Sequence, residues 1–184
     1  MTPYQLHKKN WSTCTRCSLH LTRQNVVLCK GKIPCDVLYV GEAPGESENV
    51  IGSPFVGPAG KVLDQIIGKA LYISGNGDRM ILSAFTNLVG CIPLREGEKM
   101  EPRTESIIAC APRLLEMIEM CDPKLVVAVG SLSEKWLPKI LPESLTFKVV
   151  GIVHPAAILR SDVSRRGVMF QGACVTLADA LADI

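Results

Sequence analysis

Four short aliphatic runs divide this chain, and most are followed by a turn and a segment with helical spacing. The runs cover residues 36–40, 80–85, 124–129 and 146–153. A short apolar run bounded by turn residues indicates a strand buried on both faces. The helical segments lie at 60–71, 104–120, 131–136 and 175–184. This alternation predicts an α/β fold, a three-layer sandwich with a central four-stranded parallel sheet flanked by helices.

The composition agrees with a core of aliphatic side chains. Hydrophobic residues make up 47% of the 184 positions and aromatic residues only 5%, so Val, Ile, Leu and Ala must fill the interior. The length predicts one domain over residues 1–184, in which we expect residues 1–35 to be irregular. The net charge of +2 does not indicate a nucleic-acid binder, so any basic surface must be local.

The cysteines indicate a metal centre. No stretch approaches the roughly 20 apolar residues of a membrane span, and the chain begins with a polar, basic segment. We therefore expect a cytoplasmic monomer without a membrane partner. In a reducing compartment paired cysteines favour metal ligation over disulfides. Cys14 and Cys17 form one pair and Cys91 and Cys110 a second, and their spacing alone does not separate zinc from a [4Fe–4S] cluster.

Polar side chains follow three of the predicted strands. Glu42 comes just after the first strand, Asn87 follows the second, and His154 follows the fourth. Each has an ordinary structural explanation when taken alone, such as an Asn that caps a turn. Ligands of parallel sheets bind outside the carboxyl ends of the strands, however. The shared placement of the three residues therefore predicts a site there.

The segments that carry these residues resemble one known family. Residues 41–48 (GEAPGESE) and 52–60 (GSPFVGPAG) are very similar to the first motif of the iron–sulfur branch, family 4, of the uracil-DNA glycosylase superfamily. Residues 86–89 (TNLV), before Cys91, resemble its second block, and residues 154–157 (HPAA) resemble its His-Pro-Ser/Ala motif.

The resemblance extends from about residue 10 to about residue 180, with the motifs in order. It implies a four-stranded parallel sheet between helical layers and a structural [4Fe–4S] cluster on the two cysteine pairs. It also implies hydrolysis of the bond between a base and deoxyribose in single- or double-stranded DNA, which leaves an abasic site. No lysine stands at a motif position, so we expect base excision without strand cleavage.

The resemblance also assigns residues to a pocket for an everted base. Phe55 would stack on the base and Asn87 would read its edge. His154 would donate a hydrogen bond to the base O2, where negative charge grows as the glycosidic bond stretches. Gly41 and Ala43 would let backbone N–H groups approach the base or a phosphate.

Two acidic residues and a segment after the His-Pro complete the predicted site. Glu48 corresponds to the acid that holds the attacking water, and Glu42 would orient the loop or the water. Contacts to DNA are expected from Ile158, Leu159, Arg160 and Arg165. For Ile158, packing in the core is an equally good interpretation.

Departures from the family pattern leave the choice of base open. Asn49 stands where the family usually has an acid, basic residues do not flank Cys91, and eighteen residues (92–109) separate Cys91 from Cys110. One alternative is therefore a glycosylase for a C5-modified pyrimidine, as in anti-phage defence, and another is a non-catalytic or covalently trapping lesion binder. A nucleotide-binding protein is disfavoured because the chain lacks GxxxxGK[ST] and GxGxxG.

Overall fold

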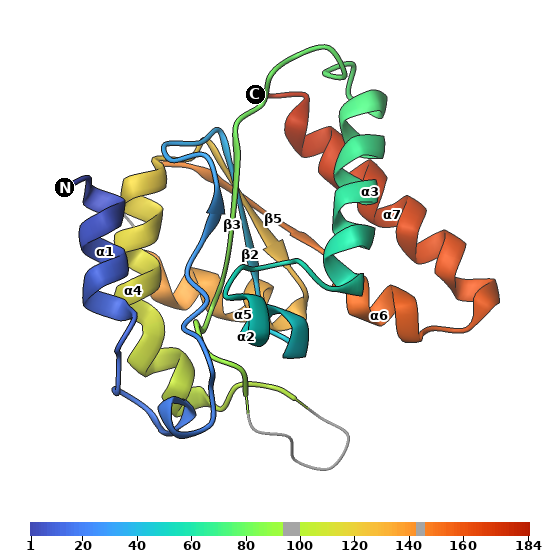
Figure 1. Ribbon diagram of the computed structural model, residues 1–184. Coiled ribbons are helices and arrows are strands. Elements are labelled where there is room, and N and C mark those ends of the chain that lie inside the picture. Colours follow the sequence, from blue (N-terminus) through green and yellow to red (C-terminus); the bar gives the residue numbers. More distant parts are fainter. Residues whose placement is uncertain (94–99, 143–145) are drawn as a thin grey trace.

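A sheet of five strands lies between two layers of helices in the computed structural model, which describes residues 1–93, 100–142 and 146–184 (Figure 1). The strands are β1 (Lys30–Gly31), β2 (Val37–Gly41), β3 (Ser83–Asn87), β4 (Leu125–Val129) and β5 (Lys148–Ile152). Their order is β1-β3-β2-β4-β5, and β2 to β5 run parallel. The predicted parallel sheet is thus confirmed.

The strand β1 corrects the predicted strand number. It pairs antiparallel with β3 at one edge and has only two residues. A strand this short carries no alternating pattern, so its sequence could not predict it.

The helices form one layer on each face of the sheet. Their bounds are α1 (Pro3–Trp11), α2 (Glu46–Ile51), α3 (Pro58–Ile73), α4 (Thr104–Cys121), α5 (Ser131–Ile140), α6 (Pro155–Arg160) and α7 (Val163–Leu181), with a 3₁₀ turn η1 (Ser18–Leu21). Helices α3, α6 and α7 pack together on one side, and α4 packs on the other side with α1 against it (Figure 1). Within the described residues, none of these helices combines the length and the apolarity that crossing a bilayer requires.

The two cores follow from the alternation of side chains along each strand. In β2, Val37 and Tyr39 belong to the core shared with α3 and α7, while Leu38 and Val40 belong to the core shared with α4. All four are at most 1% exposed. A strand buried on both faces is uniformly apolar, and this is why the sheet was readable from the sequence.

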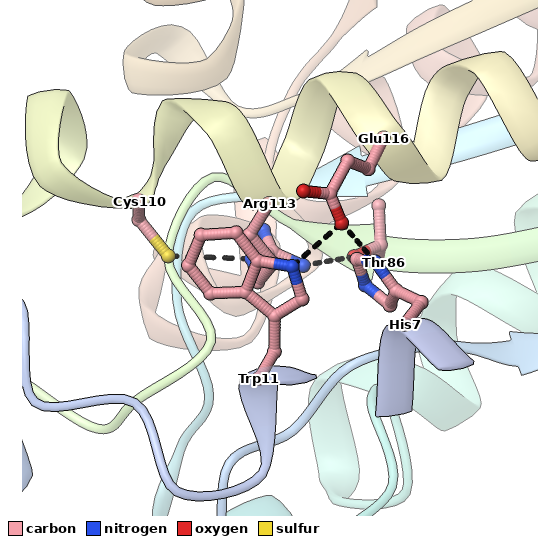
Figure 2. Close-up of polar contacts among 6 residues, drawn as sticks. All are labelled: His7, Trp11, Thr86, Cys110, Arg113 and Glu116. Atoms are coloured by element: carbon pink, nitrogen blue, oxygen red, sulfur yellow. Dashed lines mark hydrogen bonds and ion pairs between the residues drawn. The ribbon is translucent and has the colours of Figure 1, made fainter. Parts of the chain in front are cut away.

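The prediction that residues 1–35 are irregular is wrong. Helix α1 begins with a capping box, in which Thr2 Oγ1 accepts from the Gln5 N–H and Gln5 Oε1 accepts from the Thr2 N–H. It docks on α4 through Glu116, whose Oε2 lies 2.8 Å from His7 Nδ1 and accepts from Trp11 Nε1 at 2.6 Å (Figure 2). The segment Thr-Pro-x-Gln carried the signal for this helix.

The last helix is longer than predicted. Helix α7 starts at Val163, twelve residues before the expected start at Val175. Its buried residues all lie between Ala173 and Leu181, and its first turns are exposed. Only the buried half carries the apolar spacing that the prediction used.

Candidate active site

The carboxyl ends of the parallel strands bring the predicted polar residues to one edge of the sheet. Gly41 and Asn87 are direct neighbours at the ends of β2 and β3, and Val129 and Ile152 are neighbours at the ends of β4 and β5. Two sets of residues meet there. We name them the Gly41 group (Gly41, Phe55, Asn87) and the Gly130 group (Glu42, Gly130, His154).

In the Gly41 group the ring of Phe55 and the amide of Asn87 both pack directly against the backbone of Gly41. A Cβ placed on Gly41 would lie 2.4 Å from Asn87 Oδ1 and 2.6 Å from Phe55 Cζ. Only glycine allows both side chains this approach. Asn87 is 3% exposed and Phe55 8% exposed, so together they form a closely packed corner.

The backbone of Phe55 is held in an unusual conformation. Its φ of +53° lies in the left-handed region, which bulky side chains rarely adopt. Two contacts hold it there: Lys30 Nζ donates to the Phe55 carbonyl at 2.9 Å, and the start of α3 lies so close that a Cβ on Gly60 would be 2.1 Å from that oxygen. The ring packs edge-on against Phe85, with centroids 6.1 Å apart. Strain of this kind is typical of functional sites.

The Gly130 group brings an acid and an imidazole against a second glycine. Gly130 has a φ of +102°, and a Cβ there would lie 2.5 Å from Glu42 Oε1 and 3.0 Å from His154 Cβ. Glu42 follows β2, Gly130 follows β4 and His154 follows β5. These three strands are neighbours in the sheet, so residues far apart in the sequence lie close together.

His154 is set up as a neutral hydrogen-bond donor. It is the N-cap of α6, and its Nδ1 accepts from the Ala156 N–H at 3.1 Å. A neutral imidazole whose Nδ1 accepts carries its proton on Nε2. Burial, with the nearby charge of Arg160, lowers the pKa of His154 to about 4. The ring is therefore uncharged at neutral pH, and its Nε2–H, which has no hydrogen-bond partner within the described residues, can donate to a ligand.

Glu42 is also shifted toward its neutral form. Burial raises the pKa of its carboxyl above the ordinary value, while the Leu132 N–H, at 3.4 Å from Oε1, and the charge of Arg160 act in the opposite direction. A carboxylate that is harder to ionise is a stronger base once ionised, as general-base chemistry requires.

Glu48 has a different environment from the one expected. Its Oε1 accepts from the N–H groups of Val56 and Gly57 at 2.9 and 2.8 Å, and its Oε2 accepts from the Gly45 N–H at 3.1 Å. The carboxylate thus ties the two sides of the loop that carries Phe55. These contacts give Glu48 a role in positioning that loop, and its role in holding water stays a prediction.

Asn49 and Ala43 also serve the local structure. The Asn49 Oδ1 accepts from the N–H groups of Gln24 at 2.9 Å and Asn25 at 3.4 Å, which joins α2 to that segment. The side chain of Ala43 packs on a small apolar cluster that includes Val89.

The segment after His-Pro divides into buried and exposed residues. Ile158 is 4% exposed and belongs to the core beside α3 and α7, so its prediction as a DNA contact is wrong and the core interpretation holds. Leu159 is 38% exposed, and Arg160 and Arg165 are exposed. These three remain available to a partner.

The four predicted metal ligands line one cavity. Cys14, Cys17, Cys91 and Cys110 surround it together with side chains that include Trp11, Arg23 and Arg113. We name it the cysteine cavity. Arg23 Nη1 lies 3.6 Å from Cys91 Sγ, and Cys110 Sγ accepts from Arg113 Nε at 3.2 Å and from the Gly90 N–H at 3.4 Å. Among the described residues, no three His, Cys, Asp or Glu side chains form a group that could hold a single metal ion.

Three residues of this region were not predicted. Lys30 acts through its ammonium group on a distant carbonyl, and Gly130 acts through its positive φ, and neither leaves a motif in the sequence. Arg113 is 1% exposed inside α4, although arginine usually faces solvent. Its partners are 25 or more residues away in the sequence, apart from Cys110, so nothing local to the helix could have identified it.

Comparisons with known proteins identify the family of this chain. The family model of the uracil DNA glycosylase superfamily matches residues 28–177. The type-4 uracil-DNA glycosylase of Saccharolobus solfataricus is 37% identical over 126 residues, which are 68% of this chain and 55% of that protein. The chain thus spans just over half of that relative's length.

Two further relatives are covered over most of their length. The type-4 uracil-DNA glycosylase of Pyrobaculum aerophilum is 34% identical, over 83% of this chain and 82% of that protein. That of Thermotoga maritima is 32% identical, over 80% of this chain and 79% of that protein. This chain belongs to the uracil DNA glycosylase superfamily, within its type-4 branch.

Proposed function

We propose that this protein is a monofunctional DNA glycosylase that excises uracil and leaves an abasic site. The observation that carries the proposal is the convergence of the Gly41 and Gly130 groups at one edge of the sheet. The relatives' names, which specify uracil, support the same substrate.

The Gly41 group accounts for the recognition of the base. A base must leave the duplex to enter the pocket, and its flat face then needs a partner for stacking, which is the ring of Phe55. The Asn87 carboxamide accepts from uracil N3–H and donates to O4, a pattern that cytosine presents in reverse. The packing against Gly41 fixes the position of the amide.

The Gly130 group accounts for the chemistry. As the glycosidic bond breaks, negative charge moves onto the base, and the His154 Nε2–H donates to O2. Because the ring is already oriented by its cap on α6, this donor stabilises the transition state without reorganisation. Glu42 takes a proton from the attacking water, and its ionised carboxylate also favours the cationic sugar.

The test is a single-stranded oligonucleotide with one labelled uracil, assayed by alkali cleavage. Abasic product from uracil, with none from matched thymine or cytosine, supports the proposal. Product only from a C5-modified pyrimidine would move the protein to the alternative substrate. Binding without product from any base would identify a lesion binder.

We also propose that the cysteine cavity holds a [4Fe–4S] cluster on Cys14, Cys17, Cys91 and Cys110. When bound, it would join the chain before η1 to the loop after β3 and to α4, in a structural role. The residues present fit such a group, since two arginines and one backbone N–H lie against two of the sulfurs and would stabilise anionic thiolates. Iron and sulfide analysis, with absorbance near about 400 nm, separates this cluster from zinc.

The DNA would be held beside the pocket by Leu159, Arg160 and Arg165. Leu159 would contact the stacked bases of the DNA next to the position that the everted base has left. The two arginines would contact phosphates. We expect the protein to act as a monomer in the cytoplasm. Sedimentation of the free protein tests the oligomeric state.

A further inference from the structure

Arg113 is a buried cation that touches both candidate centres. Its Nε donates to Cys110 Sγ at 3.2 Å, and its Nη1 donates to Thr86 Oγ1 at 3.1 Å (Figure 2). Its Nη2 donates to the Asn87 carbonyl and, at 3.2 Å, to the Leu88 carbonyl. The guanidinium therefore lies between the wall of the cysteine cavity and the end of β3.

The charge of Arg113 needs an anion that these oxygen atoms do not supply. The carbonyls and the hydroxyl accept its N–H groups but carry no net charge, and a buried cation is unfavourable without a charged partner. Among its hydrogen-bond partners in the described residues, Cys110 is the one that can become anionic. A cysteinate that ligates a cluster supplies this negative charge.

The geometry turns this charge pair into a positional link. A guanidinium is planar and rigid, so fixing Nε against one sulfur fixes the direction of both Nη atoms. Nη2 holds the carbonyls of Asn87 and Leu88, and Nη1 holds Thr86 Oγ1, at the strand end where the Asn87 and Phe55 side chains both approach Gly41.

We propose that Arg113 is a positioning residue that couples ligation by Cys110 to the placement of the base-reading Asn87. The inference rests on the proposed function, because the role of Asn87 does. It predicts that Arg113 affects two properties at once: the electrochemistry of the cluster and the affinity for a uracil nucleotide.

Two contacts nearby provide matched controls. Arg23 reaches Cys91 Sγ at 3.6 Å but donates to no carbonyl at the end of β3 in the described residues. Glu116 lies one turn from Arg113 on α4 and holds α1 through His7 and Trp11, not the strand end (Figure 2). Arg23→Gln therefore removes a positive charge near a cluster sulfur without changing a contact to the strand end. Glu116→Gln weakens the packing of α1 on α4 without changing either the charge near a sulfur or the strand end.

The experiment compares the iron-loaded wild type with Arg113→Met, Arg113→Lys and the two controls. The readouts are iron content, reduction potential, and affinity for a single-stranded oligonucleotide with 2′-fluoro-deoxyuridine, whose glycosidic bond resists hydrolysis. Arg113→Met should keep its iron, shift the potential to more negative values and lose about tenfold in affinity. Arg113→Lys should restore the potential but not the affinity, because it keeps the charge without the planar fork.

The controls should separate these effects. Arg23→Gln should shift the potential with unchanged affinity, and Glu116→Gln should lower the melting temperature alone. Where Arg113→Met does not fold, Thr86→Val serves instead, since it removes a partner of the guanidinium and should reduce the affinity with iron retained.

The proposal would be overturned by Arg113 variants with unchanged affinity per folded molecule, or by affinity that falls equally in Glu116→Gln. Failure of the proposed function would look different. In that case the wild type itself would not discriminate 2′-fluoro-deoxyuridine from 2′-fluoro-deoxycytidine.

Discussion

The Gly41 group and the Gly130 group are each built on a glycine, but they hold their side chains by different means. The Gly41 group has no ionisable side chain, and its shape comes from packing and from an aromatic residue with positive φ. The Gly130 group has two ionisable side chains, and burial shifts both toward their neutral forms, with a raised pKa for Glu42 and a pKa of about 4 for His154.

Under the proposed function, this difference separates two tasks at the carboxyl ends of the strands. Selecting a base requires a fixed shape, which backbone contacts and close packing provide. Breaking the bond requires a proton donor and a base with suitable pKa values, which partial burial provides. Substitutions in the two groups should therefore fail in different ways.

The largest loss should follow from Asn87→Ala in the Gly41 group. Without the amide, the polar edge of uracil is buried without partners, so we expect excision to slow by about 10³-fold or more. Single-turnover kinetics on a uracil oligonucleotide measure this loss. Binding to undamaged DNA should be unchanged, and a variant that retains wild-type excision would exclude Asn87 as the base reader.

The next largest loss should come from His154 in the Gly130 group. Removing a preorganised donor typically reduces kcat by about 10²- to 10³-fold. His154→Asn is the better variant, because Asn keeps an acceptor for the Ala156 N–H at the start of α6. We expect a reduced kcat with little change in KM, and a change in KM alone would assign His154 to binding.

Glu42→Gln should reduce excision by about 10²-fold and stabilise the fold. Because burial raises the pKa of Glu42, the folded state favours the protonated carboxyl, and stability is lost as the pH rises through that folded pKa. Gln removes this penalty, so the melting temperature at pH 7 should increase. The acidic limb of the kcat/KM profile should disappear, and a limb that persists would belong to another group.

Glu48→Gln sharpens the comparison, because the two roles of Glu48 predict different results. A loop-positioning carboxylate loses hydrogen bonds to Val56, Gly57 or Gly45, so affinity for the uracil site should fall about tenfold with kcat nearly unchanged. A fall in kcat of about 10²-fold at unchanged affinity would restore the role in holding water.

The smallest effect should come from the exposed arginines, outside both groups. Arg160→Gln with Arg165→Gln should weaken binding to all sequences equally and reduce the slope of log K against log salt by about 2. Fluorescence anisotropy between low and moderate salt measures the slope. An unchanged slope would place the DNA elsewhere.

How far the sequence could predict this molecule depends on the range of each interaction. The strands, Asn87, His154 and the cysteine pairs follow from local runs and motifs, and the structure has them at the expected edge and around one cavity. Glu48 was found by its motif, but its hydrogen bonds depend on the three-dimensional path of the loop that carries Phe55, which brings Val56 and Gly57 next to its carboxylate. The role of Ile158 could not be decided from the sequence, because an apolar residue in a short helix is equally compatible with packing in the protein core and with insertion into the DNA minor groove.

Arg113 marks the limit of sequence reasoning. On α4 the apolar Ile108 is 60% exposed, while the charged Arg113 is buried. An arginine enters an interior only where partners from other elements surround it. For Arg113 they are two carbonyls, which every residue has, and the Thr86 hydroxyl, so no sequence pattern distinguishes them.

Under the proposed function, the glycine at position 41 limits how the protein can change its substrate. Most pockets gain room when a large side chain is replaced by a smaller one, but position 41 has nothing left to remove. The ring of Phe55 cannot retreat either, since the carbonyl behind it already abuts Gly60 at the start of α3. At this position, room for a bulkier nucleobase would therefore require either the main chain to move or Phe55 itself to be replaced.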